Sequence, residues 1–395
     1  MGRPVWLGLP VWNGKVAGSN PAPPTNLKGV VVKKTKIYSQ NIEQSALDQF
    51  EDAMSQEFVV SGALMPDAHM GYSLPIGSVV ATSGVVVPSW VGYDIGCGMC
   101  AVNTGIKANT ITTHADALYS DILSSVPVGF NHNKKETKWD EKPECTAFAS
   151  AVFNKNGLRQ LGSLGGGNHF IELGRGNSGD LWVVVHSGSR GIGHSIARHY
   201  MMVASNSTKA KEGHFQLSVD SVDGRGYITD MKFCEDFALA NREEIVKRVL
   251  KCISDRLSIE EITVKQFINR NHNHAELKDG LWIHRKGATH ADKGMFGVIP
   301  ANMRDGSFIV VGKGNDGSLC SSSHGAGRVF GRRVAKEALD VDTFARSMDG
   351  IVANVSSSTL DESPAAYKDI FTVMSEQEDL VEVVDHVKPI VNVKG

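Results

Sequence analysis

The segment Leu181-Trp182-Val183-Val184-Val185-His186-Ser187-Gly188-Ser189-Arg190 joins a strong strand pattern to a polar turn. Five apolar residues in a row, without alternation, are typical of a strand buried on both faces. A helical pattern follows the turn, from about Gly193 to Ala204. The sequence here predicts a strand, a turn and a helix, with polar side chains gathered at the turn.

Working outward from this unit, apolar patterns predict a mixture of strands and helices. We expect strands at residues 29–32, 58–65, 78–82, 84–87, 282–283 and 308–311, and helices at 41–54, 115–125, 232–255 and 327–339. The sequence shows no internal repeat and no linker, which favours one α+β domain over residues 28–395. Residues 206–230 are polar and irregular, so we interpret them as an insertion. The first 27 residues lack periodicity and are expected to be a disordered tail.

Composition limits the class of protein. The chain has 395 residues, of which 41% are hydrophobic and 21% charged, with a net charge of −2, so overall charge does not hold it on nucleic acid. The six cysteines are scattered apart from Cys97 and Cys100, and no second close pair completes a Cys₄ zinc site. Reduced thiols, no secretory signal and no apolar run of about 20 residues predict a cytoplasmic protein.

Five polar motifs lie at the ends of predicted strands or in the turns that follow them. They are Pro66-Asp67-Ala68-His69-Met70-Gly71, Gly92-Tyr93-Asp94-Ile95-Gly96-Cys97-Gly98, Gly165-Gly166-Gly167-Asn168-His169-Phe170-Ile171-Glu172, His186-Ser187-Gly188-Ser189-Arg190 and Asn271-His272-Asn273-His274-Ala275-Glu276. Asp94 and Cys97 offer an oxygen and a thiolate three residues apart, and His169, His186 and His272 offer imidazoles. Mixed O, N and S ligands suit Mn²⁺, Zn²⁺, Fe²⁺ or Co²⁺ rather than Ca²⁺.

A sixth motif, Ser321-Ser322-Ser323-His324-Gly325-Ala326-Gly327-Arg328, places one imidazole among small residues. Small neighbours let a phosphorylated ligand approach His324, and Arg328 can bind phosphate oxygens in a fork. Glycine-rich segments also occur as plain turns, but the isolated imidazole favours a functional role.

Three further segments are candidates for phosphate binding. The hydroxyls, flexible amides and Arg190 of the 186–190 turn form either a phosphate cradle or an ordinary Ser/Gly turn. Lys286 and Lys313 lie in loops that resemble phosphate contacts, although neither matches a Walker A motif. The sequence has no G-x-G-x-x-G, no G-x-S-x-G and no kinase signature, which disfavours those enzyme classes.

Taken together, the motifs resemble the RtcB family of RNA ligases, from about Gly29 to Gly395. The residues that carry the resemblance are Asp94–Gly98, Gly166–Phe170, His186–Arg190, His272-Asn273, Gly312–Asn315, Ser323–Arg328, Tyr367–Asp369 and Val393–Gly395. The resemblance implies mixed β-sheets around a central active-site cleft flanked by helices. It also implies a GTP-dependent ligase that joins RNA 3′-phosphate or 2′,3′-cyclic phosphate ends to 5′-hydroxyl ends, in tRNA splicing or RNA repair.

The resemblance further implies roles for individual residues. His324 would attack the α-phosphate of GTP and become guanylylated, and Asp67 would lie near the reacting ends. Asp94, Cys97, His169, His186 and His272 would hold two Mn²⁺ ions, with Cys97 shared. Asn168, Arg190 and Arg328 match phosphate-handling positions; Glu172, Ser307, Tyr367 and Lys394 match the guanine and ribose pocket; Gly325 and Gly327 match glycines beside the nucleotide.

Two stretches depart from the family pattern. Where relatives commonly have Pro-Gly-Ser-Met-Gly-Thr, this chain has Pro300-Ala301-Asn302-Met303-Arg304-Asp305-Gly306, so Asn302 replaces a nucleotide-contacting serine and two charges are added. Phe330-Gly331-Arg332 stands in place of Met-Ser-Arg. We interpret the chain as a shorter, divergent branch whose nucleotide preference and RNA substrate are open.

Two other functions remain as alternatives. One is a metal-dependent phosphoesterase or 3′-end guanylyltransferase that does not seal the ends, and the other is a non-catalytic RNA-binding relative. Retention of His324 and all five candidate ligands favours the ligase.

Overall fold

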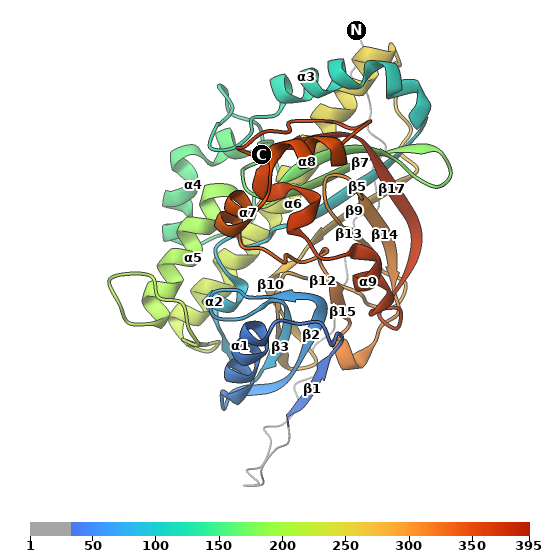
Figure 1. Cartoon of the computed structure of the whole chain (residues 1–395). Coiled ribbons are helices and arrows are strands. Elements are labelled where there is room, and N and C mark those ends of the chain that lie inside the picture. Colours follow the sequence, from blue (N-terminus) through green and yellow to red (C-terminus); the bar gives the residue numbers. More distant parts are fainter. Residues whose placement is uncertain (1–32) are drawn as a thin grey trace. The chain divides into compact units, whose positions relative to one another are not determined.

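The computed structural model describes residues 33–395, drawn in colour in Figure 1. The disordered tail expected at 1–27 and the strand expected at 29–32 both lie outside the described residues. Within the described part, helices and sheets are mixed, as the α+β prediction requires.

The larger sheet has eight strands and forms a nearly closed barrel (Figure 1). In spatial order its strands are β13 (Phe296–Pro300), β14 (Ser307–Gly312), β17 (Val381–Lys394), β6 (Phe170–Arg175), β7 (Asp180–Ser187), β5 (Gly98–Lys107) and β9 (Gln266–Asn271), with β16 (Val352–Ala353) beside β17. The two edges approach each other, since Arg270 Nε on β9 donates to Phe296 O on β13 at 3.4 Å. Near closure leaves little unpaired edge.

Strand β7 is buried on both faces, which explains its unbroken apolar run. Val183 and Val185 pack outward against α3 (Ala115–Ser125) and α6 (Val222–Leu257), whereas Trp182 and Val184 pack inside the barrel. The same alternation holds along β5. Because both faces are covered by protein, no position in these strands needs a polar side chain for solvent.

A second sheet has five strands, in the order β1 (Lys34–Ile37), β2 (Val59–His69), β3 (Ile76–Thr82), β11 (Leu281–Lys286) and β10 (Asn273–Lys278). Helix α1 (Gln44–Ser55) covers it through Phe50 and Met54. Two short pairs complete the sheet structure, β12 (Ala288–His290) with β15 (Ser321–Ser323) and β4 (Val85–Val86) with β8 (Leu217–Ser218).

The remaining α-helices are α2 (Pro88–Val91), α4 (Ala147–Gln160), α5 (Arg190–Ala204), α7 (Arg332–Ala338), α8 (Val341–Ser347) and α9 (Ile370–Ser375). None of the helices in the described part of the chain has the length and apolar character to cross a membrane.

Several predicted boundaries were wrong. The helix expected at 327–339 is confined to α7, because Gly327 has a φ of +75° and Arg328 forms a bridge with Tyr367. The irregular segment expected at 206–230 ends earlier, since α6 begins at Val222, where the Ser221 hydroxyl accepts from Gly224 N. Strand β2 also runs past Pro66 to His69, with an irregular register beyond Leu64.

Candidate active site and metal centre

The candidate metal ligands meet because their strands are neighbours and end at the same edge of the barrel. The register pairs Gly98 of β5 with Ser187 of β7 and Asn271 of β9, and it pairs Phe170 of β6 with His186. Cys97, His169 and His272 each lie one residue from these paired positions. The ends of β5, β6, β7 and β9, which come from distant parts of the sequence, therefore lie close together at this edge of the barrel.

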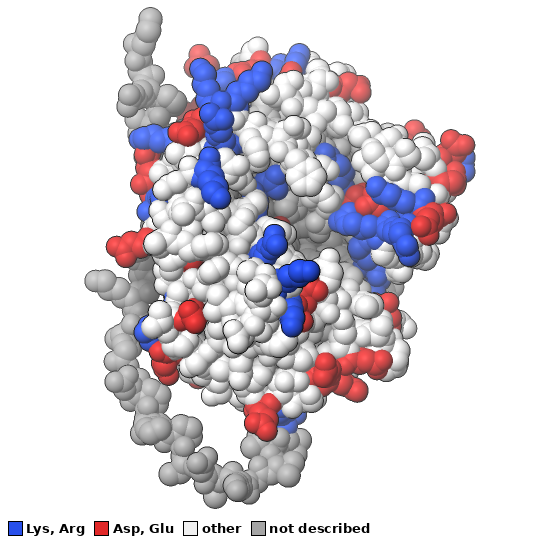
Figure 2. All heavy atoms as spheres, turned by 90° about the vertical axis from the view of Figure 1, so that its left-hand side faces the viewer, with Lys and Arg blue, Asp and Glu red and all other residues white. Residues whose placement is uncertain are grey.

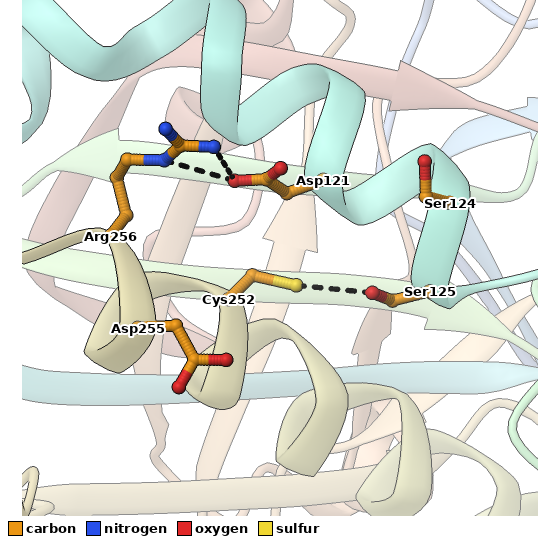
Figure 3. A pocket seen from close by; sticks show the side chains of 6 residues that line it. All are labelled: Asp121, Ser124, Ser125, Cys252, Asp255 and Arg256. Carbon is orange, nitrogen blue, oxygen red and sulfur yellow. Dashed lines mark hydrogen bonds and ion pairs between the residues drawn. The ribbon is translucent and has the colours of Figure 1, made fainter.

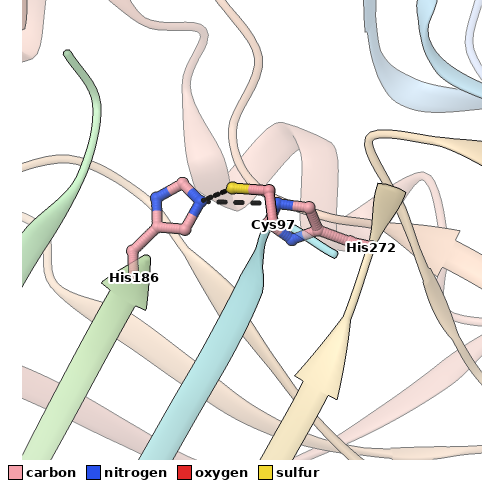
Figure 4. Close-up of side chains that lie close together, drawn as sticks. All are labelled: Cys97, His186 and His272. Carbon is pink, nitrogen blue, oxygen red and sulfur yellow. Dashed lines mark hydrogen bonds between the residues drawn. The ribbon is translucent and has the colours of Figure 1, made fainter. Parts of the chain in front are cut away.

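Three of the ligand candidates form a buried cluster of one thiol and two imidazoles (Figure 4). Cys97 Sγ lies 3.2 Å from His186 Nε2, and His186 Nε2 lies 3.3 Å from His272 Nε2. All three side chains are at most 4% exposed. Three donor atoms this close together match the spacing of ligands around one transition-metal ion.

Asp94 and His169 extend this cluster on the other side of Cys97. His169 Nε2 lies 3.1 Å from Asp94 Oδ2 and 3.5 Å from Cys97 Sγ. A side chain at Gly188 would come within 2.3 Å of the Asp94 carboxylate, so the glycine leaves room for it. Cys97 is shared by the two groups, which is the arrangement expected of a bridging thiolate.

The backbone orients two of the imidazoles. His169 Nδ1 lies 2.9 Å from Leu164 O and His186 Nδ1 lies 3.2 Å from Asn168 O. A carbonyl only accepts, so each Nδ1 carries the proton and each Nε2 turns a lone pair toward the cluster. This tautomer is the one that a metal-binding imidazole needs.

Burial holds the cluster in neutral forms. It lowers the pKa of His186 and of His272 well below the usual value, and it raises the pKa of the Cys97 thiol well above its own. Burial also raises the pKa of Asp94, but the hydrogen bond and charge of His169 outweigh it and leave that pKa lowered. Neutral imidazoles, a carboxylate and a thiol that a cation would deprotonate fit a divalent metal.

His324 lies directly beside this cluster. Its ring centroid is 4.9 Å from that of His272, at an interplanar angle of 76°. His324 Nδ1 lies 2.7 Å from Asp67 Oδ2, and the backbone amides of His324 and Gly325 donate to the same oxygen at 3.2 and 3.3 Å. The fully buried Asp67 carboxylate accepts a hydrogen bond from Nδ1–H of His324, so the Nε2 lone pair of this ring is free.

His324 and the cluster together line a cavity of about 810 Å³. Of the residues predicted for the site, those that line it are Asp94, Cys97, Asn168, His186, His272, Asn302, His324, Gly325, Gly327, Arg328, Tyr367 and Lys394. Asp67, His169, Glu172, Arg190 and Ser307 are not part of its lining. Of these, Asp67 and His169 contact lining residues, as described above.

Glu172 and Ser307 form a buried polar group next to the cavity. Asn392, which lines the cavity, donates from Nδ2 to Glu172 Oε2 at 3.4 Å. Glu172 Oε1, Ser307 Oγ and Asn392 Oδ1 have no hydrogen-bond partner. Burial raises the pKa of Glu172 to about 8. Unpartnered buried oxygens are costly, and a ligand that donates hydrogen bonds would satisfy them.

The part of the cavity lined by Arg328, Arg332 and Lys394 is cationic and is organised by Glu362, a residue that the sequence did not single out. Lys394 Nζ pairs with Glu362 Oε2 at 2.6 Å, and Arg332 Nη1 pairs with Oε1 at 2.6 Å. Arg328 Nη1 reaches the same carboxylate at 3.3 Å and Tyr367 Oη at 3.1 Å. Burial raises the pKa of Glu362, but Lys394 and Arg332 outweigh it and hold the value at about 2.

The departing stretch 300–306 reaches the cavity through Asn302. Its Nδ2 donates to Asp305 Oδ2 at 2.8 Å, and Arg304 pairs with the same carboxylate. The two added charges therefore neutralise each other.

The 186–190 turn behaves more like a structural turn than a phosphate cradle. The Ser187 hydroxyl donates to Leu164 O and the Ser189 hydroxyl to Ile95 O, at 2.7 and 2.5 Å. Arg190 donates to Ser163 Oγ and Gly129 O. Of the two lysine loops, Lys286 lines the cavity, whereas Lys313 donates to Glu378 O away from it.

A buried arginine that the sequence patterns did not indicate supports the ligand-bearing strand ends. Arg242 on α6 is fully buried and donates to Gly96 O at 2.9 Å and Ser187 O at 3.0 Å. A polar pair, Asn241-Arg242, between Phe237 and Ile245 on an otherwise apolar helix face is the signal that could have revealed it.

Two other features of the described residues contain charged groups that are already paired. A depression of about 350 Å³ between α3 and α6 contains Arg256 paired with Asp121, and Cys252 beside Ser125 (Figure 3). In the cluster of His274, Glu276 and His290, the Glu276 carboxylate already forms an ion pair with the Arg285 guanidinium at 2.5 Å.

Comparison with known proteins identifies the family of this chain. The chain is 33% identical to RNA-splicing ligase RtcB of Escherichia coli strain K12, over 90% of this chain and 95% of the relative. It is 29% identical to tRNA-splicing ligase RtcB of Nanoarchaeum equitans, over 87% and 90%, and 27% identical to that of Thermococcus kodakarensis, over 84% and 87%. The family model described as tRNA-splicing ligase RtcB matches residues 49–152 and 145–395. The chain therefore belongs to the RtcB family.

Proposed function

We propose that this protein is an RNA ligase that uses GTP and Mn²⁺ to join a 3′-phosphate or 2′,3′-cyclic phosphate end to a 5′-hydroxyl end. The observation that carries the proposal is His324, with Nδ1 bound to Asp67 and its ring against His272 at the wall of the cavity. The names of the relatives supply the substrate class, RNA.

His324 is the nucleophile in this proposal. Nε2 attacks the α-phosphorus of GTP, an N–P bond forms, the bond between the α-phosphorus and the bridging oxygen breaks, and pyrophosphate leaves. Asp67 keeps the ring in the tautomer whose Nε2 lone pair is free. The GMP group then moves to the RNA 3′-phosphate, and the 5′-hydroxyl displaces GMP to complete the ligation. A cyclic phosphate is first hydrolysed.

The donor set defines where two cations would bind. Cys97, His186 and His272 form one group, and Asp94 with His169 forms the other around the shared thiol. Bound divalent ions supply charge neutralisation for the phosphates. Imidazole and thiol donors, together with one carboxylate, suit a transition-metal ion such as Mn²⁺, Zn²⁺, Fe²⁺ or Co²⁺ better than Ca²⁺.

The buried oxygens of Glu172 and Asn392 fit guanine. The base carries N–H donors and the O6 acceptor. Glu172 Oε1 and Asn392 Oδ1 are unpartnered acceptors, and Lys394, two residues after Asn392 on β17, is a donor that also lines the cavity. Arg328, which lines the cavity, would bind phosphate in this proposal. Arg190, which does not line the cavity, would position the loop beside His169 instead.

The decisive test is transfer of label from α-labelled GTP to the protein with Mn²⁺ present. We expect labelling that is released by mild acid, as a phosphoramidate is, and that maps to the peptide containing His324. His324→Ala should abolish it. His114→Ala, a histidine outside the cavity, serves as the matched control.

Ligation of defined RNA ends completes the test. Joining of 3′-phosphate and 5′-hydroxyl RNA supports the ligase, and capped but unjoined ends would replace it with a 3′-end guanylyltransferase. Absence of any label on the unaltered protein would refute the histidine intermediate.

A further inference from the structure

An exposed tyrosine stands at the rim of the cavity. Tyr72 is 71% exposed and Met70 beside it is 58% exposed, and both belong to the cavity lining. Large apolar side chains in water at the mouth of a binding site are a surface available to a ligand. The reaction described above uses neither of them.

The backbone that carries Tyr72 is held firmly from below. Gln49 on α1 donates from Nε2 to Gly71 O at 3.0 Å and to Tyr72 O at 3.1 Å, and its Oε1 accepts from Gly71 N. Glu43 accepts from Met70 N at 2.6 Å. The ring therefore projects from a loop whose backbone is already fixed. The protein backbone loses little freedom when a ligand covers the ring.

Further rings continue this surface. Tyr72 meets Tyr93 edge to face at 6.2 Å, and Tyr93 stacks on His194 of α5 at 5.0 Å and 22°. His194 is exposed, and Arg198 lies one helical turn further on. Burial and the hydrogen bond to Glu212 raise the pKa of Tyr93 to about 12, against the opposing charge of Arg198. We call Tyr72, Tyr93 and His194 the aromatic platform.

The platform is continuous with the candidate metal centre. Tyr93 directly precedes Asp94, and both line the cavity. The nearby charges of Arg198 and Glu212 have opposite signs, so they do not form a cationic site for phosphate beside the platform. Figure 2 shows that one face of the molecule is hollowed and that Lys and Arg side chains gather around the hollow, where they can attract a polyanion.

We propose that the aromatic platform stacks an unpaired nucleobase of the RNA end whose phosphate enters the cavity. The proposal rests on the proposed function, because that function brings a single-stranded RNA end to Asp94. Stacking on aromatic rings tolerates any base, since every base has a π-face. The platform would therefore select single-stranded ends without selecting sequence.

The test measures binding of a short 3′-phosphorylated RNA, without GTP, by fluorescence anisotropy. We expect Tyr72→Ala to raise the Kd about fivefold or more, and Tyr72→Phe to retain nearly full affinity. A second RNA lacks only the terminal base. It should bind the unaltered protein as weakly as the complete RNA binds Tyr72→Ala, and the two losses should not add. Leu277→Ala, 61% exposed but outside the cavity, is the control and should change neither Kd.

An equal Kd for Tyr72→Ala and the unaltered protein would overturn the platform, and so would additive losses, because they would place the base elsewhere. Labelling by GTP is assayed separately on each variant. Intact labelling together with an unchanged RNA affinity of Tyr72→Ala would refute only the platform. Failed labelling of the unaltered protein would refute the proposed function, and the binding measurements could still be interpreted.

Discussion

The pair formed by Asp67 and His324 shows how a single buried carboxylate sets the chemistry of a neighbouring ring. One Asp67 oxygen receives three hydrogen bonds, from His324 Nδ1 and the amides of His324 and Gly325. Gly327 allows this approach, because a side chain there would come within 2.2 Å of Asp67 O. Backbone and ring are thus fixed by the same carboxylate.

Asp67→Asn should therefore slow GMP transfer by about a hundredfold or more, because the amide can donate to Nδ1 and stabilise the wrong tautomer. Single-turnover labelling with α-labelled GTP measures the rate. Bound Mn²⁺ should stay at the level of the unaltered protein, and a rate loss explained by lost metal would contradict the orienting role.

Glu172 predicts a pH dependence of guanine binding. Its pKa of about 8 means that the carboxyl is mostly protonated at pH 7, whereas in the proposed complex only the ionised form would accept both guanine N–H donors. Affinity for GMP, measured without metal, should thus rise about tenfold per pH unit up to pH 8 and then level off. Glu172→Gln cannot ionise and should give a flat profile; a rise of the same size in that variant would assign the titration to another group.

At the scale of elements, α6 acts as the support of the metal centre. The Arg242 guanidinium on this helix also donates hydrogen bonds to the side-chain oxygens of Asn269 and Asn271, at 2.7 Å each. One side chain thus ties the start of β5, the end of β7 and the end of β9 together.

Arg242→Met keeps the bulk of the side chain but leaves Gly96 O and Ser187 O without their buried donor. We expect a loss of about 2 to 5 kcal/mol in the free energy of unfolding, measured in urea, and weaker Mn²⁺ binding by titration calorimetry. Lys247→Met on the exposed face of α6 is the matched control. Equal Mn²⁺ affinity in both variants would remove Arg242 from the support.

Local pattern predicted some elements well, and the reason is physical. The α3 prediction of 115–125 matches Ala115–Ser125, and the 181–185 prediction lies within β7, because periodicity and continuous burial are local signals. Register is not local. The pairing of Gly98 with both Ser187 and Asn271, which gathers the ligands, joins positions that are 89 and 173 residues apart in the sequence.

The residue types of the site were therefore predictable, while their partners were not. The family resemblance supplied His324 and the five ligand candidates, and the structure brings them together. Nothing in the sequence indicated that Glu362 would pair with Lys394 and Arg332, since 32 and 30 residues separate those pairs. The same holds for the unpartnered oxygens of Glu172 and Ser307.

At the scale of the whole molecule, a bound metal pair would link four strands of the barrel and raise its stability. Ligand binding to the native state at a hundred times the Kd contributes about 2.7 kcal/mol. Mn²⁺ should therefore raise the melting temperature by a few degrees, and a chelator should reverse the shift. Cys97→Ala should lose the response. Cys100→Ala, a buried thiol on β5 outside the cluster, should keep it, and loss of the response in both would point to a packing effect.

Strand β17 carries a consequence for the timing of synthesis. It lies between β14 and β6 in the middle of the barrel, and Lys394 at its end reaches Glu362. While the ribosome is still making residues before 381, β14 and β6 are present but the strand that pairs with both of them is not. Glu362 also lacks its partner Lys394 at that stage. A nascent chain of this protein therefore completes its barrel, and the pair between Lys394 and Glu362, only when the last strand has been made.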